Sequence, residues 1–243
     1  MENTSKQASV IMQELKQLED MKRAHKQQSF FKTGKGDYGE GDIFLGVKVP
    51  WQRKISKRHY ANTETEDIRT LLSSPVHEHR LTGTFILVLK YQKTRDKAEK
   101  ENLKDVYLDN TAAFNNWDLV DSSAHHILGH WLHDKSDKKI LYHLARSEDL
   151  WEQRIAMIAC MYDIKKGRFE TAFDIAEILL YHKHDLIHKA VGWMLREIGK
   201  KDADAEESFL KKHYREMPRT MLRYAIERFP DEKRQAYLKG EIR

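Results

Sequence analysis

Ile187-His188-Lys189-Ala190-Val191-Gly192-Trp193-Met194-Leu195-Arg196-Glu197-Ile198 sets the fold class, because its apolar residues recur every three or four positions. That spacing places one apolar stripe on one face of an α-helix: Ile187, Val191, Met194 and Ile198. A second such stripe is Trp151, Ile155, Ile158 and Tyr162. From Pro50 onward the same periodicity recurs between short polar breaks, with no credible strand pairing. The sequence therefore predicts an all-α protein.

The predicted helices recur in a loose register. Four stretches align: Val76-His77-Glu78-His79-Arg80, Trp117-Asp118-Leu119-Val120-Asp121, Trp151-Glu152-Gln153-Arg154 and Leu186-Ile187-His188-Lys189. Their polar ends are 41, 33 and 35 residues apart. A helix pair that recurs at this length is typical of a HEAT or armadillo-like solenoid, in which stacked pairs build one continuous core and a curved, concave surface. An irregular all-α bundle is the alternative.

We expect one α-solenoid domain over residues 1–243, with an N-terminal helix within 1–30 (roughly 7–28), a glycine-rich loop at 31–47 and helical repeats over 48–243. The glycines between Gly34 and Gly46 mark the loop. This loop lacks the Gly-Lys-Ser/Thr ending of a Walker loop and a preceding strand, so nucleotide binding is not expected.

Composition limits the class of protein. The chain has 243 residues, 40% of them hydrophobic, and only four prolines, so it can bury a substantial core. The single cysteine, Cys160, excludes an internal disulfide framework, and the polar N-terminus does not resemble a signal peptide. No apolar run approaches the roughly 20 residues of a membrane span. We expect a soluble cytoplasmic protein without a membrane partner.

The net charge of +5 is unevenly distributed. Residues 1–60 carry 12 Lys/Arg against 7 Asp/Glu, and the densest part, 48–58, holds five cations and no acid. A second excess, ten Lys/Arg to five Asp/Glu, lies in residues 211–243. The segment 48–58 is a candidate phosphate-facing patch. The alternative for both segments is a solvated helix face.

Asn115-Asn116-Trp117-Asp118-Leu119-Val120-Asp121 is the strongest chemical signal, because it sets Trp117 and Asp121 one helical turn apart on nearly the same face. An indole beside a carboxylate suits a positively charged substrate. Trp117 also lies on the apolar stripe of Val120, Ala124, Ile127, Leu128 and Trp131. The alternative is therefore a core tryptophan and a boundary acid paired with an arginine. We assign Asp118 to structure, since a carboxylate in a first helical turn stabilises the helix dipole and caps free N–H groups.

Trp193 points about 120° away from its apolar stripe. Its side chain either packs against the next repeat or lies on the curved surface, where it could contact a bound ligand. Arg154 sits beside the Trp151 stripe, where an ion pair with an acid such as Asp121 or Asp118 is the structural interpretation.

Three histidines, His126, His130 and His133, share one helical face and raise a metal hypothesis. That face is mostly turned from the apolar stripe, so the histidines are better explained as surface side chains, and we predict no metal site. We expect Cys160 to be a packed free thiol.

The chain resembles the AlkD-type DNA alkylation repair proteins, which are HEAT-like-repeat DNA glycosylases. The resemblance extends from about residue 43 onward and rests on four stretches: Phe44-Leu45-Gly46-Val47-Lys48-Val49-Pro50, Trp117-Asp118-Leu119-Val120-Asp121, Leu150-Trp151-Glu152-Gln153-Arg154 and Lys189-Ala190-Val191-Gly192-Trp193-Met194-Leu195-Arg196-Glu197. It implies that Trp117, Asp121 and Trp193 form the catalytic constellation, that Arg154 contacts DNA beside it, and that the concave face binds DNA. Lys48, Arg53 and Arg223 match the family's DNA-contacting segments.

The activity that this resemblance implies is hydrolysis of the N-glycosidic bond of cationic N3- or N7-alkylated purines in duplex DNA. The enzyme would be monofunctional, need no metal, nucleotide or redox cofactor, and act as a monomer on alkylated double-stranded DNA, as a nucleoid-associated cytoplasmic protein. The chain departs from the family in its longer, glycine-rich Gly34–Asp42 loop and in Asn116, where the family often has a second aromatic residue. The alternatives are a non-catalytic HEAT-repeat protein that binds branched or distorted DNA, and a protein-interaction scaffold.

Overall fold

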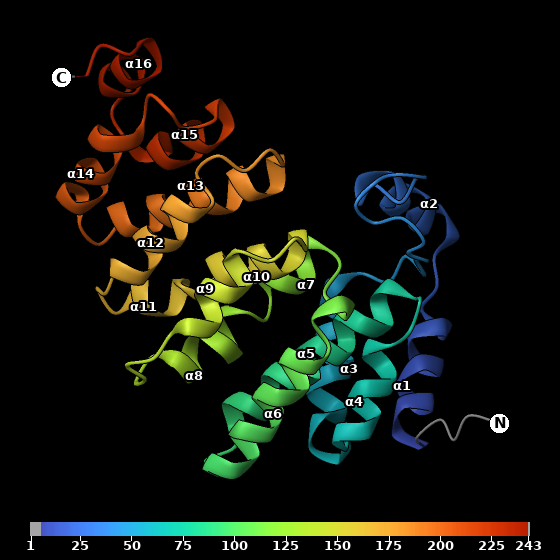
Figure 1. Ribbon diagram of the computed structural model, residues 1–243. Helices are drawn as coiled ribbons and strands as arrows, with labels where there is room; N and C mark the ends of the chain where they lie inside the picture. The colour runs from blue at the N-terminus through green and yellow to red at the C-terminus, as the bar shows by residue number, and fades with distance from the viewer. Residues whose placement is uncertain (1–5, 243) are drawn as a thin grey trace. The chain divides into compact units, whose positions relative to one another are not determined.

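The structure is a computed structural model that describes residues 6–242, and it is built from helices (Figure 1). Within those residues the sole β feature is an isolated parallel bridge between Ile43 and Val76. The all-α prediction is confirmed. The chain divides into two compact units, residues 1–123 and 124–243, which are described separately here. The single domain over 1–243 stays a prediction.

The helices of the first unit are α1 (Lys6–Gln17), α2 (Met21–Phe30), α3 (Val49–His59), α4 (Thr65–Leu72), α5 (His77–Lys93), α6 (Lys97–Asp109) and α7 (Trp117–Asp121), with 3-10 turns at Tyr60–Asn62 and Thr111–Ala113. Helix α5 is the central element, because α3, α4 and α6 all pack against it (Figure 1). Its apolar middle, Phe85-Ile86-Leu87-Val88, is buried. The core of this unit therefore lies around α5.

The second unit contains a π-helical turn (His125–Gly129) followed by α8 (His130–Leu132), α9 (Lys139–Ala145), α10 (Leu150–Ala159), α11 (Met161–Lys165), α12 (Glu170–Ile178), α13 (Asp185–Gly199), α14 (Ala203–His213), α15 (Arg219–Ala225), a 3-10 turn (Ile226–Arg228) and α16 (Asp231–Lys239). Helix α13 is the central element, and α10, α14 and α15 pack against it. Its predicted apolar stripe is fully buried: Ile187, Val191, Met194 and Ile198.

The predicted register matches helix starts in the structure. Helices α5, α7, α10 and α13 begin at His77, Trp117, Leu150 and Asp185, each within one residue of the start of one of the four aligned stretches. The spacing of these four helix starts agrees with the predicted helical repeat.

Two predicted helices are interrupted. The N-terminal helix expected over 7–28 is two helices, because Asp20 adopts an extended conformation and its side chain accepts the backbone N–H of Arg23 as the N-cap of α2. The helix expected from Asn116 through Trp131 breaks after Asp121. There the buried Ser123 hydroxyl donates to the carbonyl of Leu119, which competes with regular helix hydrogen bonding.

The glycine-rich region is irregular but anchored at its end. The buried Glu78 carboxylate accepts backbone N–H groups from Leu45, Gly46 and Val47 at 2.9, 2.8 and 3.2 Å. Gly46 has a φ of +79°, and a Cβ there would lie 2.2 Å from the Asp20 carbonyl oxygen. The chain can therefore cross the start of α2 closely enough to reach Glu78 only with glycine at this position.

Candidate functional site

Trp117 and Asp121 lie on the short helix α7, as the sequence predicts, and both side chains are partly exposed. The helix begins at Trp117 because the fully buried Asn116 is its N-cap, with its side-chain oxygen accepting the Trp117 N–H at 2.9 Å. Asp118 is in the first turn, and its Oδ1 accepts the N–H of Leu119. The capping assignment of Asp118 is confirmed.

The indole of Trp117 packs against the N-terminal segment. The Phe31 ring stacks on it at a centroid distance of 5.4 Å, and the Phe30 ring meets it edge-on at 6.0 Å. Phe31 belongs to a small buried cluster with Ala24 and Phe44. Trp117 is thus neither a fully buried core residue nor a freely exposed one, and the segment that ends in Phe31 covers part of the ring.

Behind α7 lies a buried charged network that the sequence analysis did not find. The His77 side chain is 2% exposed; its Nδ1 lies 3.1 Å from Asp42 Oδ2 and its Nε2 lies 2.9 Å from Asp118 Oδ2. Arg80 Nη2 donates to Asp42 Oδ1 at 2.7 Å, and the amide of Asn115 donates to the same oxygen at 2.9 Å. Segments distant in sequence therefore meet at one imidazole.

The network shifts the pKa of its members. Burial alone would lower the pKa of His77, but the Asp118 charge and the hydrogen bonds to Asp118 and Asp42 outweigh it and raise the pKa to about 9. Burial alone would raise the pKa of Asp42, but the hydrogen bond from His77 and the Arg80 charge lower it. His77 is therefore an imidazolium at neutral pH.

Asp121 lies at the end of α7, close to Tyr107. Burial raises the pKa of the Tyr107 hydroxyl, and the nearby Asp121 charge raises it further. The Ser123 and Tyr107 hydroxyl oxygens lie 3.3 Å apart, within hydrogen-bonding distance. A partly exposed carboxylate in this position could stabilise a cation or accept a proton from water.

In the second unit, Trp193 is half-buried and lies off the buried stripe of α13, as predicted. Its indole N–H donates to Glu197 at 3.1 Å. The preceding Gly192 lets α15 approach, since a Cβ there would lie 2.4 Å from the carbonyl oxygen of Met221. Gly192 thus allows α13 and α15 to pack closely next to the position of Trp193.

Arg154 is more buried than a phosphate-binding arginine usually is. Its residue is 4% exposed, and its Nη1 donates at 2.5 Å to the carbonyl of Leu186 in the first turn of α13. Arg154 therefore joins α10 to α13 within the second unit.

The predicted phosphate-binding residues lie on exposed helix surfaces. Lys48 is the N-cap residue of α3, Arg53 follows on α3, and Arg223 lies in the last turn of α15. The Arg53 guanidinium is 4.0 Å from the centroid of the Phe85 ring, a contact that limits its freedom. The segment 48–58 is thus a basic helix face held against the core of the first unit.

The histidine cluster has structural partners. His130 and His133 both contact the Tyr162 ring edge-on, and His133 Nδ1 pairs with Asp163. These histidines are half-buried rather than surface side chains, because the Tyr162 ring packs against them. Within residues 6–242, no three His, Cys, Asp or Glu side chains are arranged so that they could hold a metal ion. Cys160 is a buried free thiol, as predicted, and burial raises its pKa to about 12.

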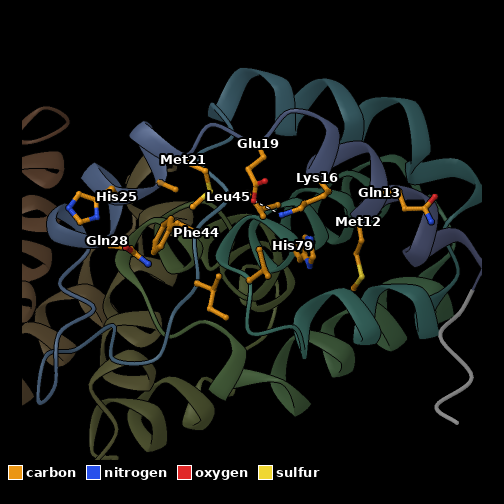
Figure 2. A pocket seen from close by; sticks show the side chains of 13 residues that line it. Met12, Gln13, Lys16, Glu19, Met21, His25, Gln28, Phe44, Leu45 and His79 are labelled. Carbon is orange, nitrogen blue, oxygen red and sulfur yellow. Dashed lines mark hydrogen bonds and ion pairs between the residues drawn. The ribbon is translucent and has the colours of Figure 1, made fainter.

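A pocket of about 530 Å³ lies in the first unit between α1, α2 and the start of α5 (Figure 2). Its wall includes Met21, Phe44 and Leu45, and the Lys16–Glu19 ion pair lies beside it (Figure 2). Phe44 also stacks on His77 at 4.5 Å. The pocket and the His77 network therefore share a side chain.

The buried charged residues at the start of α5 could be recognised only weakly from the sequence. The stretch Val76-His77-Glu78-His79-Arg80 places charged and polar groups at the start of a long apolar helix. Apolar periodicity alone predicts that such residues lie at an exposed helix end, yet His77, Glu78 and Arg80 are all buried. Most of their partners lie in the glycine-rich region and in residues 115–118, and periodicity cannot place these segments beside α5.

Comparison with known proteins identifies the class and the family. A protein of known structure described as a predicted DNA alkylation repair enzyme from Enterococcus faecalis has the same fold, with a TM-score of 0.69 and 17% identity over 88% of this chain and 97% of that one. The family described as DNA alkylation repair enzyme matches residues 11–229. The chain belongs to the DNA alkylation repair enzyme family. No curated protein matches it.

This membership gives the protein a role in DNA repair. Across residues 6–242 the structure contains no helix with the length and apolar character needed to span a membrane.

Proposed function

We propose that this protein is a monofunctional DNA glycosylase that hydrolyses the N-glycosidic bond of cationic N3- or N7-alkylated purines in duplex DNA. The observation that carries the proposal is the partly exposed indole and carboxylate on the single turn of α7 in a chain of this family. We assign catalysis to Trp117, Asp121 and Trp193, as the family resemblance implies.

The chemistry follows from the charge of the lesion. An alkylated purine carries a formal positive charge, so its glycosidic bond is already weakened. When the bond from C1′ to the base nitrogen breaks, its electron pair leaves with the base, which departs neutral, and the sugar gains oxocarbenium character. The Asp121 carboxylate would stabilise that cation and accept a proton from the water that attacks C1′.

The two tryptophans would recognise charge rather than base identity. The π-faces of Trp117 and Trp193 attract a cationic nucleotide, at about 0.5 to 2 kcal/mol for each favourable contact. Because the resemblance assigns no lysine nucleophile to the constellation, we propose that the reaction stops at an abasic site. The enzyme needs no cofactor in this scheme.

A base-release assay tests this proposal. The protein is incubated with methylated duplex DNA, and free 3-methyladenine and 7-methylguanine are measured by chromatography. We expect release of alkylated base, abasic sites in the DNA, and no protein–DNA crosslink on borohydride reduction. Salt-sensitive DNA binding without release would contradict the proposal and favour a non-catalytic DNA-binding protein, whereas absence of both would favour a protein scaffold.

We propose that Lys48, Arg53 and Arg223 contact DNA phosphates, with Arg154 near the lesion. Because Arg154 is buried and bonded to Leu186, we expect fewer direct phosphate contacts from it than from the exposed Lys48. The partner would be alkylated double-stranded DNA, bound by a monomer at the nucleoid. Such contacts position the duplex without reading its sequence.

Lys48→Gln should weaken binding to every duplex alike, since the lysine would neutralise one phosphate. We expect the slope of log affinity against log salt concentration to decrease by about 1. Fluorescence anisotropy over a salt series measures this slope. Lys139→Gln is the matched control, because Lys139 is an exposed lysine paired with Asp137 outside the predicted contacts. Equal slopes for both variants would remove Lys48 from the interface.

A further inference from the structure

His77 holds together two segments that frame the proposed site. Asp42 comes from the glycine-rich region, and Asp118 comes from α7, directly after Trp117. Both carboxylates are within hydrogen-bonding distance of the imidazole, at 3.1 and 2.9 Å, and the His77 side chain is 2% exposed. The proposed reaction makes no direct use of these three residues.

We propose that His77 is a positioning residue: as a doubly protonated imidazolium it ties Asp118 to Asp42 and so fixes α7, with Trp117 and Asp121, in place. The consequence for catalysis rests on the proposed function. The consequence for the position of Trp117 does not.

The hydrogen bonds require both protons. A neutral imidazole has one N–H, so it could donate to only one carboxylate, and its other nitrogen would direct a lone pair at the second. The groups that face His77 are the carboxylates of Asp42 and Asp118, the Arg80 guanidinium, and the Phe31 and Phe44 rings. The two carboxylates raise the pKa of His77 by more than burial and the Arg80 charge lower it. The pKa of His77 is therefore raised to about 9.

Helix α7 depends on such a tie because it is only five residues long, too short to be stable by itself. The Asn116 cap and the bond from His77 to Asp118 secure its first turn. The Phe31 ring contacts both the His77 ring, at 5.1 Å, and the Trp117 ring, at 5.4 Å. A change at His77 should therefore alter the surroundings of the Trp117 indole.

The sign of the pH dependence follows from the raised pKa. An ordinary histidine loses its proton near its pKa of 6.5, whereas His77 in the folded protein keeps its proton up to about pH 9, because its pKa is raised to about 9. The stabilisation is therefore complete below about pH 6.5 and is lost as the pH rises through about 9. The tie should be intact at neutral pH and released in alkaline solution.

The position of Trp117 can be tested without any activity measurement. The full chain is labelled with 5-fluorotryptophan, and Trp117→Phe and Trp193→Phe assign two of its fluorine NMR signals. Between about pH 7 and about pH 10, we expect the Trp117 signal to shift with a midpoint near 9 and the Trp193 signal not to follow that titration. His77→Gln should abolish the shift.

Two further variants make the test specific. His79→Gln is the matched control: it changes the same residue type two positions away on α5, and burial with the Arg80 charge lowers the pKa of His79 to about 4. It should leave the titration of Trp117 intact. Asp42→Asn removes one anionic partner and should move the midpoint below that of the wild type, which gives a readout even if His77→Gln fails to fold. A Trp117 signal that does not titrate in the wild type, or titrates unchanged in a folded His77→Gln or in Asp42→Asn, would overturn the proposal.

Base release separates this proposal from the proposed function. If the protein is a glycosylase, we expect His77→Gln to lower kcat at neutral pH by roughly tenfold or more, because small displacements of catalytic groups are costly. Wild-type activity should fall above about pH 9, a decline that the variant lacks. If the Trp117 signal titrates but the wild type releases no base, the proposed glycosylase activity is contradicted and the positioning role of His77 is supported. Equal kcat and pH profiles for an active wild type and His77→Gln would reject the positioning role alone.

Discussion

Asp121→Asn is expected to reduce the rate of alkylated-base release by roughly 10² to 10⁴-fold. Asparagine keeps the size of the side chain but has neither the charge that stabilises a cationic sugar nor the basicity to accept a proton from water. Because Asp121 is not assigned a phosphate contact, DNA affinity should stay nearly unchanged. Single-turnover release of 7-methylguanine measures the rate, and fluorescence anisotropy measures the affinity.

Asp109→Asn is the matched control for this experiment. Asp109 lies at the end of α6 in the same unit, is exposed and pairs with Arg69 on the surface, so the same chemical change should leave the rate near that of the wild type. Equal release by the wild type and Asp121→Asn would remove Asp121 from the mechanism. A similar loss in both variants would mean that the effect comes from charge in general rather than from the carboxylate on α7.

Gly46→Ala should destabilise the protein by about 3 kcal/mol or more. Two costs combine: the backbone of Gly46 is left-handed, with a φ of +79°, and the new methyl group would lie 2.2 Å from the Asp20 carbonyl oxygen and 2.7 Å from the Ala24 nitrogen. Both neighbours are backbone atoms and cannot rotate away. The segment would have to move off Glu78, whose buried carboxylate would then lose hydrogen bonds. Urea unfolding followed by circular dichroism measures the loss.

Gly41→Ala is the control that separates the backbone strain of a positive φ from the steric clash of the new methyl group. Gly41 lies in the same region with a φ of +87°, but nothing is within 4 Å of a Cβ there. It should cost only the conformational strain of alanine, about 1 to 2 kcal/mol. If Gly46→Ala costs no more than Gly41→Ala, the close crossing over α2 does not determine the stability of this segment.

Much of the fold could be read from the sequence because helical periodicity is a local property. The spacing of apolar residues predicted the buried stripe of α13 and the outward direction of Trp193, and the polar stretches marked the starts of α5, α7, α10 and α13. The assignment of Asp118 to capping was likewise local, since its side chain accepts the N–H of the next residue, Leu119. Each of these features depends on residues within a few positions of one another.

What surrounds the candidate site was decided by tertiary structure. His77 lies 35 residues from Asp42 and 41 residues from Asp118, and their meeting depends on the path of the chain through the glycine-rich region. The same holds for the Phe31 ring on Trp117, and for Arg154, whose hydrogen bond to the Leu186 carbonyl depends on the packing of α10 against α13. The sequence alone determined the all-α class, the buried stripe of α13 and the approximate starts of four helices. The chemistry proposed for Trp117, Asp121 and Trp193 comes from the family resemblance. Only the packing of distant segments decided which charges are buried and which rings are covered, because burial and pairing depend on neighbours that no local pattern specifies.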